Sequence, residues 1–141
     1  ADAQHLTAEF ICKLNCDRNP LPAIALGTNS SSITAIGNDY GFNYIFSREL
    51  EALGSSKDFL IAISTSGNSK NIINLLRKAK EIKMPIALLT GPNKNSKADS
   101  YADFVCYSPE ICKETLEIQQ IHIAIGHYIC LFGQSDFILE Q

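Results

Sequence analysis

The chain of 141 residues is long enough for one domain with a single hydrophobic core. Hydrophobic residues make up 45% and charged residues 19%, which is typical of a globular protein and excludes a disordered chain. The formal net charge of −3 predicts that neither nucleic acid nor an anionic membrane surface is a partner. No apolar run approaches the roughly 18 residues that a membrane-spanning helix needs, so no membrane span is expected.

The five cysteines indicate a reducing compartment. An odd number in a chain of this size favours free thiols over a disulfide framework, so we expect a cytoplasmic protein. Cys12 and Cys16 lie four residues apart and would share a helix face, which suits a zinc site. Neither belongs to a CxxC pair, however, and unligated thiols are the favoured interpretation.

The first predicted element is a helix over residues 1–10, and no strand precedes it. A doubly wound domain normally has a strand and a glycine loop before such a helix. We therefore expect residues 1–141 to form a single domain that is incomplete at its N-terminal end.

Four short apolar runs predict parallel strands that are buried on both faces. They cover residues 22–26, 59–63, 85–89 and, more weakly, 103–107. Helical patterns cover residues 42–53, 71–83 and 116–132. This alternation predicts an α/β fold, with a doubly wound parallel sheet flanked by helices and right-handed crossovers.

A serine-rich loop joins the strand at 59–63 to the helix at 71–83. A helix start at the carboxyl end of a parallel strand offers unpaired N–H groups and partial positive charge to an anion. Gly67 permits a sharp turn and a close approach of the backbone. Capping of the helix would explain one polar residue but not four hydroxyls, so we expect a bound phosphate. The hydroxyls belong to Ser64, Thr65, Ser66 and Ser69.

The loop and its flanks resemble the sugar isomerase (SIS) fold and, within it, the phosphoheptose isomerases. The segments GNDYGF at 37–42 and ISTSGNS at 63–69 are specific when they occur together. The further matching stretches are AQH at 3–5 with Glu9, FSR at 46–48, EALG at 51–54, LTG at 89–91, and IQ at 118–119 with His122 and His127.

This resemblance implies an enzyme that converts sedoheptulose 7-phosphate to D-glycero-D-manno-heptose 7-phosphate in the synthesis of bacterial surface polysaccharides. It also implies a homotetramer whose active sites lie between subunits. The phosphate contacts map onto Ser64, Thr65, Ser66 and Ser69, and Asp39 matches an acid that contacts the substrate.

A zinc ion is also implied by the resemblance, with a ligand pattern that maps onto His5, Glu9, Gln119 and His127. The spacing is compatible with this set, because His5 and Glu9 share a helix face and Gln119 and His127 share another. His122 is off that second face by roughly 60°, which indicates an indirect or structural role.

An aldose–ketose isomerisation needs a base for a carbon-bound proton, an acid for the oxygens and a group that stabilises the enediolate. We assign the base to Glu9 and the proton transfers at oxygen to His127. A zinc ion bound with His5 and Gln119 would polarise the substrate oxygens.

Several positions depart from the family pattern. The family's Gly-Asn-Gly-Gly-Ser loop before the first helix is absent, and Cys12-Lys13 replaces its Gly-Arg, which exchanges a planar donor for a point charge. Asn29 stands where an acid is frequent, and residues 114–117 differ from the usual Thr-Ala-Arg. These changes are expected to shift substrate choice or lower activity.

Two other functions are compatible with this fold. Paralogues of the family act as tetrameric adaptors that bind the replication initiator, but they typically lack the glutamate and the final histidine that are Glu9 and His127 here. A sugar-phosphate-sensing module is the third possibility. It ranks last because the chain is acidic and carries no helix-turn-helix.

Overall fold

Three parallel strands form the centre of the fold in the computed structural model, which describes residues 1–135. They are β1 (Leu60–Ser64), β2 (Ile86–Thr90) and β3 (Phe104–Tyr107), in the order β1-β2-β3. The register places Leu60 opposite Ile86 and Ala87 opposite Phe104. Each strand lies within one residue of a predicted apolar run, so these three predictions are confirmed.

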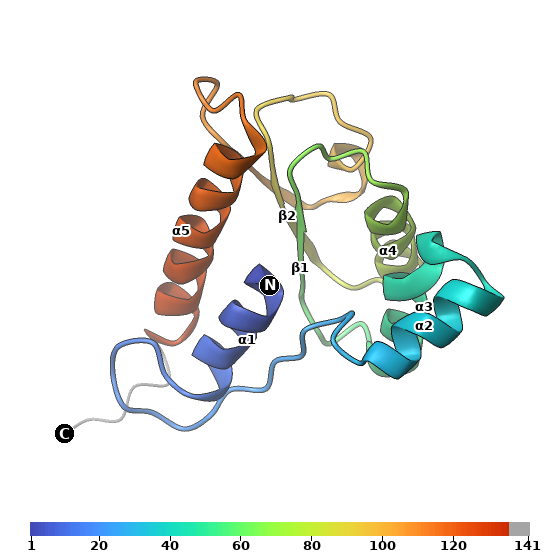
Figure 1. The fold of residues 1–141 in the computed structure, drawn as a ribbon. Helices are drawn as coiled ribbons and strands as arrows, with labels where there is room; N and C mark the ends of the chain where they lie inside the picture. Colours follow the sequence, from blue (N-terminus) through green and yellow to red (C-terminus); the bar gives the residue numbers. More distant parts are fainter. Residues whose placement is uncertain (136–141) are drawn as a thin grey trace.

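Helices cover both faces of the sheet (Figure 1). One face carries α1 (Asp2–Ile11) and α5 (Thr115–Gly133), and the other carries α3 (Ile45–Leu53) and α4 (Lys70–Glu81), with α2 (Ser30–Asp39) packed outside α3. Two short 3-10 helices are η1 (Phe42–Tyr44) and η2 (Asp99–Tyr101). This arrangement confirms the predicted α/β class with a parallel sheet flanked by helices.

The core lies between α4 and the sheet. All five residues of β2 are buried, because β2 is the central strand and has helices on both sides. From α4, Leu75, Leu76 and Ala79 pack into this core, following the three-to-four-residue spacing predicted for that helix. The core holds the strand ends in place, and the loops that follow them carry the candidate site.

The predicted strand at residues 22–26 is wrong, since none of these residues forms part of the sheet. A strand requires hydrogen bonds to a neighbour, and a cavity of about 760 Å³ lies between residues 22–27 and β1. The outer edge of β1 therefore has no paired strand in the described part of the chain. The apolar character of residues 22–26 reflects their position on the wall of this cavity.

Helix α2 did not follow from the hydrophobic pattern, because none of its residues is fully buried. It is preceded by Asn29, whose side chain accepts a hydrogen bond from the backbone N–H of Ser32 at 3.1 Å. Asn29 thus acts as the N-cap of α2. All five cysteines are free thiols. Within residues 1–135 no helix combines the length and apolar character needed to cross a membrane.

Candidate active site between α1 and α5

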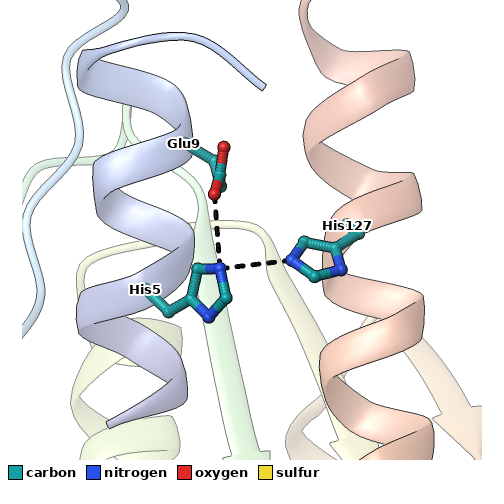
Figure 2. Close-up of side chains that lie close together, drawn as sticks. All are labelled: His5, Glu9 and His127. Atoms are coloured by element: carbon teal, nitrogen blue, oxygen red, sulfur yellow. Dashed lines mark hydrogen bonds and ion pairs between the residues drawn. The ribbon is translucent and has the colours of Figure 1, made fainter. Parts of the chain in front are cut away.

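Three side chains with metal-binding and proton-transfer chemistry meet between α1 and α5 (Figure 2). The Nε2 atom of His5 lies 3.3 Å from Oε1 of Glu9 and 3.3 Å from Nε2 of His127. The two imidazole rings are arranged edge to face, with their centroids 5.0 Å apart. His5 and Glu9 come from successive turns of α1, as their spacing predicted, and His127 comes from a helix more than 100 residues later in the chain.

Close packing of the two helices brings these side chains together. Leu6 is buried against Gly126 of α5, where an added Cβ would lie only 2.6 Å from the Leu6 Cδ1 atom. One turn further along α5, the Cys130 thiol is 3.9 Å from the Leu6 carbonyl oxygen. Gly126 therefore lets α1 approach closely enough for the neighbouring His127 to reach His5.

The donor set fits a divalent metal ion. One atom from each of His5, Glu9 and His127 lies within 4.8 Å of the others. Two imidazole nitrogens and one carboxylate oxygen are common ligands of catalytic zinc, which keeps a further position open for water or substrate. The cysteines do not join this cluster. Burial raises the pKa of the Cys130 thiol to about 11, so without a metal ion it stays protonated at neutral pH.

Gln119 and His122 lie on α5 without contacting the cluster. Gln119 is exposed on the wall of the cavity beside β1 and forms no hydrogen bond to the three residues in the described chain. His122 is fully buried, and neither of its ring nitrogens has a hydrogen-bond partner within residues 1–135. Burial lowers the pKa of His122. The nearby backbone of Thr90 raises this pKa by a smaller amount, although it forms no hydrogen bond of normal geometry with the ring. A neutral, buried His122 agrees with an indirect or structural role.

The serine-rich loop forms the turn from β1 into α4, as predicted. Gly67 has a φ of 61°, and its backbone N–H lies 3.2 Å from the Oγ atom of Ser64. Ser69 is the N-cap residue of α4, yet its side chain makes no capping hydrogen bond. Capping therefore does not account for this hydroxyl. The hydroxyl-bearing side chains of Ser66 and Ser69 are exposed, whereas Ser64 is buried beneath the turn.

A second loop, residues 91–99, packs against the serine-rich loop and supports it. The Asn68 side chain accepts a hydrogen bond from the N–H of Lys97 at 3.1 Å, and the Gly67 carbonyl accepts one from Ala98 at 3.0 Å. Asp99 accepts hydrogen bonds from the hydroxyls of Ser96 and Tyr107, the latter at 2.9 Å. Burial raises the pKa of Tyr107, and this hydrogen bond acts in the same direction. The turn at Gly67 is thus held by the loop that follows β2, and Tyr107 of β3 supports that loop through Asp99.

Asp39 lies apart from both groups. It is exposed at the C-terminal end of α2, where its carboxylate accepts a hydrogen bond from Asn38 at 2.7 Å. It lines a polar groove of about 610 Å³ together with Arg48 and Arg77. Within the described chain no hydrogen bond or ion pair joins Asp39 to the loop or to the cluster, and its role as a substrate contact stays a prediction.

The fold and the loop define the class of protein. The family profile of the SIS domain matches residues 1–91, which include α1 and the serine-rich loop. The phosphoheptose isomerase of Clostridium acetobutylicum is 47% identical over the whole chain, which covers 70% of that relative. The enzyme of Rhodospirillum rubrum is 45% identical over 92% of the chain and 68% of its own length. The chain belongs to the phosphoheptose isomerase family and is an isomerase.

Solved structures agree with this assignment. A phosphoheptose isomerase from Neisseria gonorrhoeae has a TM-score of 0.85 at 39% identity, covering 95% of this chain and 70% of that one. One from Francisella tularensis has a TM-score of 0.84 at 36% identity, covering 92% and 68%. The family resemblance drawn from the two sequence motifs is therefore confirmed, and the adaptor and sensing alternatives have no support from these relatives.

Gly126, which sets the approach of α1 to α5, carried no signal in the sequence.

Proposed function

We propose that the cluster of His5, Glu9 and His127 catalyses the isomerisation of sedoheptulose 7-phosphate to D-glycero-D-manno-heptose 7-phosphate. The observation that carries this proposal is the convergence of one carboxylate and two imidazoles, within 4.8 Å of one another, from two helices of an SIS-domain chain. The reaction needs a base at carbon and a proton carrier at oxygen, and this cluster offers both.

The roles follow from the chemistry of each side chain. The Glu9 carboxylate removes a proton from C1 of the ketose, a C1–C2 double bond forms, and the C2 carbonyl oxygen gains a proton. Return of a proton to C2 and loss of the proton from the C1 hydroxyl then give the aldose. We assign these transfers at oxygen to His127, because a neutral imidazole both accepts and donates a proton near pH 7.

We further propose zinc as the metal ion at this site, with Gln119 as a fourth ligand beside His5, Glu9 and His127. When bound, the ion supplies polarisation of the substrate oxygens and stabilises the enediolate charge. The His₂Glu donor set supports zinc. Gln119 precedes His127 by about 12 Å along the axis of α5. Its side chain would therefore have to extend along the helix toward His127 to bind the same ion.

The serine-rich loop is the proposed phosphate site, formed by Ser64, Thr65, Ser66 and Ser69. The exposed hydroxyls and the first N–H groups of α4 provide donors, and the helix start adds partial positive charge. Ile63, directly before the loop, lines the same cavity as Gln119 and the first residues of α1. We propose that a substrate held by its phosphate at the loop extends its sugar end toward α1, where it would react.

A coupled assay with sedoheptulose 7-phosphate tests the proposal. We expect turnover that a chelator abolishes and that added Zn²⁺ restores, since the cluster would lose its electrophile without the ion. Full activity in chelator would contradict the metal assignment. Absence of turnover under every metal condition would contradict the isomerase assignment for this site, and retained binding to an initiator protein would then favour the adaptor function.

We place the reaction in the cytoplasm, which the five free thiols support.

A homotetramer with active sites between subunits is the quaternary structure that we propose. Its support is an exposed apolar stripe on α5, where the rings of Tyr128 and Phe132 stack with centroids 6.3 Å apart and remain 61% and 71% exposed. Exposed aromatic residues of this kind are enriched in subunit interfaces. In such an assembly Asp39 of one subunit would complete the site of its neighbour.

Light scattering with size-exclusion chromatography tests this assembly. We expect Tyr128→Asp to lower the molar mass below that of a tetramer, because it places a charge in a desolvated apolar contact. Ile111→Asp is the matched control, since Ile111 is 84% exposed in the loop that precedes α5, 17 residues before Tyr128 in the chain. A tetramer that persists in the Tyr128 variant would show that this stripe is not the interface.

A further inference from the structure

Arg18 is a buried cation at the junction of α1 and α5. Arg18 is only 6% exposed. Within residues 1–135 no carboxylate forms an ion pair with its side chain. A buried charge without an opposite charge is costly unless other polar groups compensate for it. The compensation in this protein comes from oxygens, most of which lie at the ends of α1 and α5.

Within residues 1–135, four hydrogen bonds join Arg18 to its surroundings. Its guanidinium donates to the backbone carbonyls of Glu9 at 2.6 Å, Phe10 at 2.8 Å and Asn19 at 3.0 Å. The remaining bond goes from Nε to the side-chain oxygen of Gln134 at 3.0 Å. Glu9 and Phe10 belong to the last turn of α1, where helical carbonyls lack partners within the helix. Gln134 is the C-cap residue of α5.

The two helices run in the same direction, and their C-terminal ends lie together (Figure 1). Each helix end carries partial negative charge, so two adjacent C-terminal ends repel one another. A guanidinium between them is attracted to both, and its planar set of donors reaches carbonyls on α1 and the amide on α5 at once. Gln134 is fully buried and its Nε2 atom has no partner in the described residues, so its only side-chain hydrogen bond there is the one to Arg18.

We propose that Arg18, together with Gln134, is a positioning residue that sets the distance between α1 and α5 at the His5–Glu9–His127 cluster. Arg18 contacts the backbone of Glu9 itself, while Gln134 lies seven residues after His127 on α5. The cluster draws its ligands from both helices, so a shift of one helix along the other separates His127 from His5 and Glu9. This inference rests on the proposed function of the cluster, but it concerns the helices that carry it.

The test compares Arg18→Lys and Gln134→Met with wild type and with the control Lys113→Arg, which exchanges the same two residue types at an exposed position in the loop before α5. Lysine keeps the charge but not the planar set of donors, and methionine keeps the volume of glutamine without its oxygen. The probe is Co²⁺ alone, whose visible absorption reports the ligand geometry. We expect both variants to bind Co²⁺ about tenfold more weakly, which is typical when a residue supporting the ligands is lost.

Kinetics and a metal-free measurement complete the design. In the variants kcat should fall while KM for the sugar phosphate changes little, because the phosphate loop lies on β1 and α4. Without metal, the nuclear Overhauser contact between the rings of His5 and His127 should weaken in both variants. If wild type binds Co²⁺ but shows no turnover, the proposed reaction fails while the affinities still test Arg18.

Three outcomes would overturn the role of Arg18. The first is wild-type Co²⁺ affinity and spectrum together with wild-type kcat in both variants. The second is an unchanged contact between the two imidazole rings. The third is loss of folding in both variants, which would make Arg18 a residue of the core rather than of the site.

Discussion

The variant Glu9→Gln should lose turnover by about 100- to 10,000-fold in kcat, the range that general-base catalysis supplies. Glutamine keeps the size of the side chain and its hydrogen-bonding oxygen but cannot take a proton from carbon. Its carboxamide is also a weaker metal ligand, so the assay must be run at saturating Zn²⁺. Binding of the sugar phosphate should change little, since the phosphate site is formed by the loop after β1.

Saturating zinc separates the two roles of Glu9. If the carboxylate acts only as a ligand, excess Zn²⁺ restores turnover in the variant, and the base must be sought elsewhere. If it is the base, exchange of the C1 proton with solvent deuterium stops even with the metal bound. Glu110→Gln is the matched control, because this carboxylate is 81% exposed and its only ion pair within residues 1–135 is with Lys94; it should keep wild-type kinetics.

The variant Gly67→Ala should raise KM for the sugar phosphate by about 10- to 100-fold, because the turn that presents the hydroxyls cannot form unchanged. Gly67 has a φ of 61°, which costs an alanine about 1 kcal/mol. The larger effect is steric, since an added Cβ would overlap the side chain of Ser96. Ser96 cannot retreat easily, because it is hydrogen-bonded to Asp99.

Inorganic phosphate as a competitive inhibitor checks the same prediction without catalysis. Its inhibition constant should rise with KM in Gly67→Ala, while the affinity for Co²⁺ at the cluster should remain unchanged. For stability the matched control is Gly37→Ala in α2, where an added Cβ meets no atom within 4 Å. Alanine there should raise the midpoint of thermal unfolding slightly, by its better helix propensity. A wild-type KM in the Gly67 variant would show that the loop does not hold the phosphate.

Local patterns were sufficient for most of the secondary structure. The strands at 60–64, 86–90 and 104–107 were predictable because a parallel strand buried on both faces is a short, nearly continuous apolar run. The run at 22–26 has the same composition but forms no strand, because pairing depends on a neighbour at hydrogen-bonding distance and a cavity lies there instead. Composition cannot distinguish an apolar strand from an apolar cavity wall.

The candidate site also has parts that local sequence patterns predict and a part that they do not. The serine-rich loop and the pair His5 and Glu9 depend on residues close together in the chain, where turn chemistry and helical spacing decide the geometry. The contact of His127 with that pair is different, since it requires two helices to pack at a particular distance. Family resemblance predicted that contact, but no periodicity in the chain expresses it.

The serine-rich turn, the helix face of His5 and Glu9 and the parallel sheet were accessible from the amino-acid sequence, because each is an interaction over a few residues. Tertiary structure alone decided which of these parts meet. Gly126 lets Leu6 approach α5, Ser96 and Asp99 support the turn at Gly67, and Arg18 holds two helix ends together. These contacts join residues that are separated in the chain, and their energies depend on burial and on close packing, which exist only once the whole domain has folded.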